Sequence, residues 1–270
     1  MKSLNRKRIG PWCLVLLLAL LPAVAAGCGE QAGGVAPEAE LLVSAAASLQ
    51  EALEEIGAAY RQENPGVKIT FNFGSSGTLQ RQIEQGAPVD LFLSAAQLQM
   101  DELEGQGLIL SETRQDLLRN ELALITGKSN EAINGVEDLT QEAVATVAIG
   151  VPETVPAGQY AREALQNLGL WEALQDKMVT GKDVKQVLTY VETGNADAGF
   201  VYLSDAVNSD RVKIVTVLPA DLHEPIVYPA AVVKGAPHQE AAQAFLAYLN
   251  SDAAGEIFAK YGFKLAKGGE

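Results

Sequence analysis

The feature of this sequence that most constrains its fold is a regular alternation of short apolar runs with segments of helical spacing, which begins at Leu41. The runs predict strands, because each is short and bounded by turn-forming residues. Between them, apolar residues recur three or four positions apart, as in 49–60 and 184–191. The last such segment, 239–261, predicts two helices around Asn250-Ser251-Asp252. Strands that alternate with helices indicate an α/β protein with mixed, mostly parallel sheets. We place the strands at 41–46, 67–73, 89–94, 122–126, 147–150, 198–202, 212–217 and 228–233.

The chain from residue 40 onward is long for one open sheet and suits two lobes. No linker rich in Pro and Gly divides it cleanly, so we expect a hinge that the chain crosses at least twice. We place the first crossing near Asn120 and the return near Tyr228. The predicted domains are a signal peptide at 1–27, a tether at 28–39, lobe 1 at 40–121 plus 228–270, and lobe 2 at 122–227.

The first 27 residues have the pattern of a secretory signal: a basic start, a short apolar middle and a small-residue end. The apolar stretch is interrupted by Pro11 and Pro22 and is too short for an ordinary membrane span. The Ala-Ala-Gly-Cys ending resembles a bacterial lipoprotein signal, which implies that Cys28 is lipidated after cleavage. Residues 28–39 have no hydrophobic period and are typical of a flexible tether. These features predict a protein anchored by lipid on the outer face of the cytoplasmic membrane.

Charge and residue counts exclude several classes of protein. With 34 acidic and 20 basic side chains, the net charge of −14 has the wrong sign for a protein whose main partner is nucleic acid. Two Cys and two His are too few for a disulfide framework or a zinc site built from these residues alone. We therefore expect neither a resident metal nor a cofactor.

Four turns that lead from a predicted strand into a predicted helix are rich in hydrogen-bond donors. They are a turn at Ser48 with Glu51 in capping-box spacing, the turn 73–78, the turn 155–158, and a turn with Asp183 at the helix start. Each helix start supplies unpaired N–H groups and a partial positive charge, which suit an anion. Taken singly, each turn is better explained by ordinary helix capping than by ligand binding. In open α/β sheets, however, such turns gather at the carboxyl ends of the strands, where ligands bind.

Motifs for catalysis are weak in this chain. Residues 127–129 lack the earlier glycine of a phosphate-binding loop, and no Gly-x-Ser-x-Gly elbow activates a serine. His223 and His238 lie in polar loops next to prolines, which favours solvated side chains over a general base. Asp90 begins a predicted strand, where a structural hydrogen-bonding role is favoured.

Six short motifs resemble the periplasmic molybdate-binding proteins of ABC importers, in the same order along the chain. One departure is Gly77, where relatives often have a third serine. The resemblance covers about Leu41 to Lys264. Its motifs are Ala45-Ala46-Ala47-Ser48-Leu49, Phe73-Gly74-Ser75-Ser76-Gly77-Thr78-Leu79, Gly86-Ala87-Pro88-Val89-Asp90-Leu91-Phe92, Val155-Pro156-Ala157-Gly158-Gln159-Tyr160-Ala161, Gly199-Phe200-Val201-Tyr202 with Ser204-Asp205-Ala206, and Tyr228-Pro229.

The resemblance implies a two-lobed periplasmic binding protein of type II, monomeric and not an enzyme. Its expected ligand is molybdate or tungstate, delivered to an ABC permease and its ATPase. The ligand would be held by the hydroxyl and N–H groups of Ser48 and Ser76, the N–H groups of Ala157 and Val184, and the hydroxyl of Tyr202. Unaided, the sequence favours Tyr202 as a core residue.

Two alternatives remain open at this stage. Sulfate satisfies the same donors, so another tetrahedral oxyanion is the nearest one. A secreted hydrolase with Ser76 or Ser48 as nucleophile is the other, although no base for it is visible. A protonated phosphate should be rejected, because its hydrogen needs an acceptor that the binding stretches lack.

Overall fold

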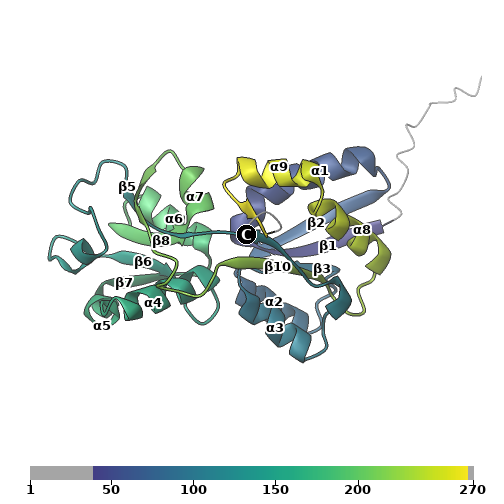
Figure 1. Ribbon diagram of the computed structural model, residues 1–270, viewed down its shortest axis with the longest axis horizontal. Coiled ribbons are helices and arrows are strands. Elements are labelled where there is room, and N and C mark those ends of the chain that lie inside the picture. The colour runs from purple at the N-terminus through teal and green to yellow at the C-terminus, as the bar shows by residue number, and fades with distance from the viewer. Residues whose placement is uncertain (1–38, 267–270) are drawn as a thin grey trace, which may run out of the picture. The chain divides into compact units, whose positions relative to one another are not determined.

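The computed structural model describes residues 39–266, which fall in one compact unit. The predicted signal peptide, Cys28 and nearly all of the predicted tether lie outside the described residues. Two sheets, each covered by helices, make a two-lobed type II fold (Figure 1). We call the lobe with the six-stranded sheet lobe 1 and the lobe with the five-stranded sheet lobe 2.

Lobe 1 is built on a sheet in the order β11-β4-β10-β3-β1-β2. Its strands are β1 (Ala39–Ala46), β2 (Val67–Gly74), β3 (Leu91–Leu93), β4 (Gln115–Arg119), β10 (Val227–Val232) and β11 (Lys264–Leu265). Its helices are η1 (Ala47–Leu49), α1 (Gln50–Glu63), α2 (Ser76–Glu84), α3 (Gln97–Gly105), η2 (Ser111–Thr113), α8 (Gln239–Leu249) and α9 (Asp252–Lys260).

Lobe 2 is built on a sheet in the order β7-β6-β8-β5-β9. Its strands are β5 (Leu122–Gly127), β6 (Val147–Gly150), β7 (Met178–Gly181), β8 (Ala198–Tyr202) and β9 (Val212–Val217). Its helices are η3 (Glu137–Thr140), α4 (Pro156–Asn167), α5 (Trp171–Leu174), η4 (Gln175–Lys177), α6 (Val184–Glu192) and α7 (Leu203–Val207).

Helices cover both faces of the lobe 1 sheet. The side chains that alternate along a strand therefore pack into two different apolar clusters. Along β3, Leu91 and Leu93 belong to one apolar cluster with α1 and α8, whereas Phe92 belongs to a second cluster with α2 and α3. Successive side chains of a strand point to opposite faces, so a strand that is apolar throughout needs cover on both sides. Figure 1 shows α1, α8 and α9 on one side of this sheet and α2 and α3 on the other.

The chain crosses between the lobes twice, and the two crossings lie side by side. Strand β4 leads directly into β5, and β9 returns to β10. The Asn120 N–H donates to the Ile226 carbonyl at 3.1 Å, which joins the two segments. The lobe boundaries drawn from the sequence, at 121/122 and 227/228, stay a prediction.

All eight predicted strands are present, but the sheets are less parallel than the alternation predicts. Parallel pairing joins β1 to β2 and β3, and β6 to β7 and β8, whereas β10 and β5 pair antiparallel with their neighbours. β5 and β10 follow the two crossings between the lobes and run antiparallel to their neighbours. The order of strand and helix segments in the sequence does not reveal these directions. Strands β4, β7 and β11 were not predicted from the sequence, since they are short or polar and are defined by their neighbours.

The predicted break in the C-terminal segment is confirmed at Ser251, which is the N-cap of α9. Its hydroxyl oxygen accepts from the Ala254 N–H at 3.3 Å. Helix α8 ends at Leu249 with Asn250 as its C-cap, so the two helices meet as the pattern indicates.

Replacing this cap tests how much it contributes. Ser251→Ala should lower the free energy of unfolding by about 1 kcal/mol, because one N–H of α9 loses its acceptor. For a domain of this size, this corresponds to a fall in Tm of roughly 2 to 4 °C in a thermal melt. The exposed Ser129 provides the control, and Ser129→Ala should leave Tm unchanged. Equal melting of the two variants would contradict the role of the cap.

Candidate functional site

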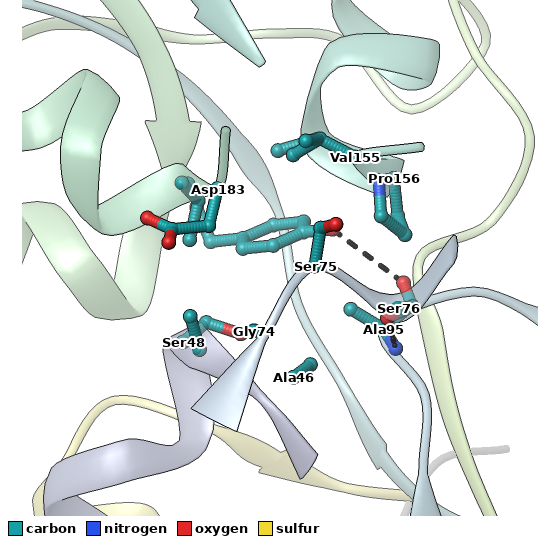
Figure 2. A pocket seen from close by; sticks show the side chains of 13 residues that line it. Ala46, Ser48, Gly74, Ser75, Ser76, Ala95, Val155, Pro156 and Asp183 are labelled. Atoms are coloured by element: carbon teal, nitrogen blue, oxygen red, sulfur yellow. Dashed lines mark hydrogen bonds between the residues drawn. The ribbon is translucent and has the colours of Figure 1, made fainter. Parts of the chain in front are cut away.

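A small cavity lies between the lobes at the carboxyl ends of β1, β2, β6, β7 and β8. Its volume is about 10 Å³, on a scale where one buried water needs roughly 10 to 15 Å³. Figure 2 shows Val155, Pro156 and Asp183 of lobe 2 facing Ser48 and Ser75 of lobe 1. On that scale the cavity is about as large as one water molecule, which is far too small for a sugar or a peptide.

The structure brings all five residues of the predicted ligand set to this cavity. Ser48 and Ser76 line it from lobe 1, and Ala157, Val184 and Tyr202 line it from lobe 2. Their role in binding stays a prediction at this point. What the structure adds is that residues up to 154 positions apart in the chain share one enclosed space.

Three helices begin at the cavity, each directly after a strand. Ser75 caps α2 by accepting from the Thr78 N–H at 3.4 Å, and Asp183 caps α6 by accepting from the Gln186 N–H at 2.8 Å. Pro156 is the first residue of α4, where a missing N–H costs nothing. The predicted cap at Asp183 is thus confirmed, and the first turns of α2, α4 and α6 present N–H groups that have no partner within their own helices.

The predicted capping box at Ser48 is wrong. Helix α1 begins at Gln50 with Leu49 as its N-cap, and Ser48 lies in the short helix η1. The Ser48 side chain is buried, and its Oγ lies 3.0 Å from Tyr228 Oη. Glu51 bonds Lys185 rather than the backbone, so no reciprocal box forms. Instead of capping α1, the Ser48 side chain makes a tertiary hydrogen bond with a residue 180 positions away in the sequence.

A chain of hydrogen bonds orients the Ser48 hydroxyl. Asn120 Oδ1 accepts from the Glu121 N–H at 2.9 Å, which leaves Asn120 Nδ2 as the donor to Tyr228 Oη at 3.3 Å. Tyr228 Oη accepts this bond and shares a second one of 3.0 Å with Ser48 Oγ, in which either hydroxyl can be the donor. The bond to Tyr228 holds Ser48 Oγ in place at the cavity that Ser48 lines.

The Ser76 hydroxyl is oriented in the same way by a backbone group. Ser76 is fully buried, and its Oγ accepts from the Ala95 N–H at 2.9 Å. With its acceptor lone pair engaged, the hydroxyl proton is free to donate to a ligand. Hydrogen bonds thus hold two serine hydroxyls from two different turns at the cavity.

Tyr202 adds a third hydroxyl, from the carboxyl end of β8. Burial raises the pKa of Tyr202 well above its ordinary value, and the neighbouring Tyr228 adds to this, so the hydroxyl remains a proton donor. The rings of Tyr202 and Tyr228 pack edge to face with centroids 5.6 Å apart. The Tyr202 hydroxyl lies 3.5 Å from the Ala95 carbonyl, a weak contact that a ligand can replace.

Charged side chains surround the cavity but hardly enter it. Among the described residues that line it, Asp183 is the only charged one, and its carboxylate caps α6. Next to Val184, Lys185 Nζ lies 2.8 Å from Glu51 of lobe 1 and 3.1 Å from Asp205 of lobe 2. This ion-pair cluster, Glu51–Lys185–Asp205, therefore bridges the lobes beside the site.

Burial dominates the electrostatics of that cluster. The Asp205 side chain is fully buried, and burial raises the pKa of its carboxyl against the opposing effect of Lys185. Burial also disfavours the charged form of Lys185, but Asp205 and Glu51 outweigh this and raise its pKa. Lys185 therefore stays charged at neutral pH and compensates the buried carboxylate.

Other titratable residues play structural parts. Asp90 accepts from the Leu42 N–H at 2.8 Å and the His238 N–H at 2.9 Å, which confirms its hydrogen-bonding role. The predicted solvated side chain of His223 is wrong, because the ring is buried against Tyr160 and its Nδ1 lies 2.8 Å from the Glu224 carbonyl. Within residues 39–266, no group of three or more His, Cys, Asp or Glu side chains could hold a metal ion. No helix in that range is long and apolar enough to span a membrane.

Two α/β lobes that enclose a small, donor-lined cavity define a solute-binding protein. The family model described as bacterial extracellular solute-binding protein matches residues 41–264, and the chain belongs to that family.

Individual relatives agree with this assignment. A putative ABC transporter substrate-binding lipoprotein, YvgL, from Bacillus subtilis is 45% identical over 88% of this chain and 92% of its own length. The molybdate-binding protein ModA of Haemophilus influenzae is 42% identical over 84% of this chain and 91% of its own length. A solved substrate-binding domain of a putative molybdenum ABC transporter from Clostridium difficile is 47% identical, with a TM-score of 0.66, over 84% of this chain and 98% of that one.

The sequence did not predict that Tyr228 and Asn120 position the Ser48 hydroxyl. Tyr228 appears in a motif of the resemblance without a role, and Asn120 marks only a predicted crossing. No local pattern connects them to Ser48, since the three residues come from β10, from the segment after β4 and from η1. The only signal was the position of Tyr228 and Asn120 at the two predicted crossings between the lobes.

Lys185 is expected to stabilise the protein by compensating the charge of the buried Asp205. Lys185→Met should destabilise the protein by about 3 to 5 kcal/mol, because it leaves a buried carboxylate without its cation. Adding Asp205→Asn should restore much of the lost Tm. Lys260→Met removes an exposed pair with Glu55 and should cost less than about 1 kcal/mol. Thermal melts of the three variants measure these effects. If adding Asp205→Asn does not restore Tm, the compensation of Asp205 by Lys185 is refuted.

Proposed function

We propose that this protein captures molybdate, and also tungstate, between its lobes and delivers the ion to an ABC import permease and its ATPase. The observation that carries the proposal is that hydrogen bonds hold the Ser48 and Ser76 hydroxyls at a small cavity where three helices begin. The names of the relatives from Haemophilus influenzae and Clostridium difficile support the choice of oxyanion.

The donor set suits a dianion that carries no proton. The proposed contacts are the hydroxyls of Ser48, Ser76 and Tyr202 and the first-turn N–H groups at Ser48, Ser76, Ala157 and Val184. Each charge-assisted hydrogen bond contributes roughly 1.5 to 3 kcal/mol before the cost of stripping water from the ion and closing the lobes. No carboxylate among these groups can accept the hydrogen of a protonated phosphate, and the Asp183 carboxylate caps α6, so a protonated phosphate is disfavoured.

The rival functions receive less support from the site. A serine hydrolase needs a base within hydrogen-bond reach of its nucleophile, whereas Ser48 contacts a tyrosine and Ser76 a backbone N–H. The residues that line the cavity include no His or Lys. Sulfate offers the same charge as molybdate, so only its smaller size distinguishes it. We therefore propose that the protein binds without catalysis, uses no cofactor and selects its ion by size.

The proposed location follows from the N-terminal segment. Cleavage before Cys28 would leave a cysteine for lipid attachment, followed by a tether up to residue 39, on the outer face of the cytoplasmic membrane. The relative from Bacillus subtilis is named a lipoprotein, which supports this part of the proposal. We propose that the protein acts as a monomer, with lobe 1 at 40–121 plus 228–270 and lobe 2 at 122–227.

Calorimetric titration tests the ligand and one of its contacts together. Molybdate and tungstate should bind with submicromolar Kd, sulfate more weakly, and phosphate not measurably. Ser76→Ala should weaken molybdate binding by about one to two factors of ten, because one charge-assisted hydrogen bond is lost. The exposed control Ser129→Ala should bind as the wild type does. Equal affinity for sulfate and molybdate would refute the selectivity, and a Ser76→Ala variant with wild-type affinity would refute the site.

The hydrogen-bond chain from Asn120 predicts an effect of a residue that does not touch the ion. Tyr228→Phe removes the hydroxyl that holds Ser48 Oγ, so the Ser48 hydroxyl can turn away and molybdate should bind about tenfold more weakly. Tyr60→Phe is a matched control, since Tyr60 is buried but packs against Phe245 and Tyr248. Both are measured by titration. An unchanged Kd for Tyr228→Phe would show that Ser48 needs no orienting partner.

A further inference from the structure

The two lobes make a close backbone contact at the rim of the cavity. Gly77, the second residue of α2 in lobe 1, donates its N–H to the carbonyl of Thr154 in lobe 2 at 2.9 Å. Gly77 directly follows Ser76, and Thr154 directly precedes Val155, and both of these neighbours line the cavity. The contact therefore lies where the separation of the lobes determines the width of the site.

There is no room for a side chain at this contact. A Cβ on Gly77 would lie 2.8 Å from both the Cα and the carbonyl oxygen of Thr154, and 3.2 Å from its carbonyl carbon. Ordinary van der Waals contact of a Cβ begins at about 3.4 Å, so the gap would have to open by about 0.6 Å. The atoms in the way are backbone atoms, which cannot rotate aside as the end of a side chain can. Gly77 has no positive φ, so close approach, and not backbone conformation, is what requires glycine.

The loop that carries Thr154 has little freedom to give way. The N–H groups of Thr154 and Val155 both bond the Val151 carbonyl, at 3.0 and 2.8 Å. Behind them, Gly150 and Gly158 pack so tightly that a Cβ on Gly158 would lie 2.0 Å from the Gly150 carbonyl oxygen. The loop is thus pressed against the start of α4 and cannot retreat into lobe 2.

The opposite side of the contact is held equally firmly. Ser75 caps α2, and Ser76 Oγ accepts from the Ala95 N–H, which ties the start of α2 to the end of β3. With both partners fixed inside their own lobes, extra bulk at Gly77 can be accommodated only by moving one lobe away from the other.

We propose that in this chain Gly77, at a position where relatives often have a serine, sets the closest approach of the two lobes and thereby helps to determine which oxyanions the site holds. The inference rests on the proposed function and deepens it. Ser76 moves with Gly77, and Ala157 is three residues beyond Thr154, so a wider contact separates donors that must reach the same ion from opposite sides. A smaller ion loses contact with one lobe first.

The variant Gly77→Ala tests this with two readouts. Molybdate should bind at least tenfold more weakly, and sulfate should lose more than molybdate where its wild-type Kd is measurable. In the absence of ligand, Tm should stay the same or rise, because alanine favours a helix more than glycine does and the clash exists only between closed lobes. Gly105→Ala in α3 is the matched control, since no atom lies within 4 Å of its added Cβ. It should not change the affinity.

The outcomes separate the inference from the proposed function. Binding of none of the four oxyanions by the wild type would refute the proposed function. If the wild type binds molybdate and Gly77→Ala binds it equally well, only the role of Gly77 is refuted. A ligand-free Tm that falls markedly in Gly77→Ala would likewise overturn it, because the clash would then lie within lobe 1. A Gly77→Leu variant should weaken molybdate binding further than Gly77→Ala does, as a steric stop requires, and equal losses would count against the proposal.

Discussion

The structure depends on one constraint: backbone N–H groups at the starts of helices have no partner within the helix and must find one elsewhere. Three helices begin at the same cavity, two from lobe 2 and one from lobe 1, so their unpaired donors and partial positive charges add up in one place. An anion can be held there without a cationic side chain. The protein is strongly acidic overall, yet its cavity is lined by neutral donors, and screening at physiological salt, about 8 Å, limits the distant charges mainly to an effect on rates.

The hydroxyls at the cavity are held in place by other groups of the protein. Tyr228 and the Ala95 N–H hold Ser48 and Ser76, and Asn120 in turn bonds Tyr228. Of these partners, Tyr228 and Asn120 do not themselves line the cavity. The positions of the cavity hydroxyls therefore depend on residues outside it.

Closure of the lobes is determined by contacts of opposite kinds. The Glu51–Lys185–Asp205 cluster draws the lobes together by charge, and the backbone contact of Gly77 with Thr154 limits their approach by volume. An attraction that acts over several ångströms and a repulsion that rises within a few tenths of an ångström together define one separation. A site that selects by ionic radius needs such a defined width, because all tetrahedral dianions offer the same charge to the same donors.

By itself, the sequence determined the elements whose signals are local: the eight apolar strands, the cap at Asp183, the break at Ser251 and the turns that lead into the helices. The family resemblance, not spacing, pointed to Tyr202. Tertiary structure alone decided the antiparallel crossing strands, the burial of His223 and the partner of Ser48, which the local pattern assigned to a capping box. The physical reason is range. Capping and amphipathic spacing act within a few residues, whereas the bond from Ser48 to Tyr228 and the contact of Gly77 with Thr154 exist only after distant segments and separate lobes have been brought together.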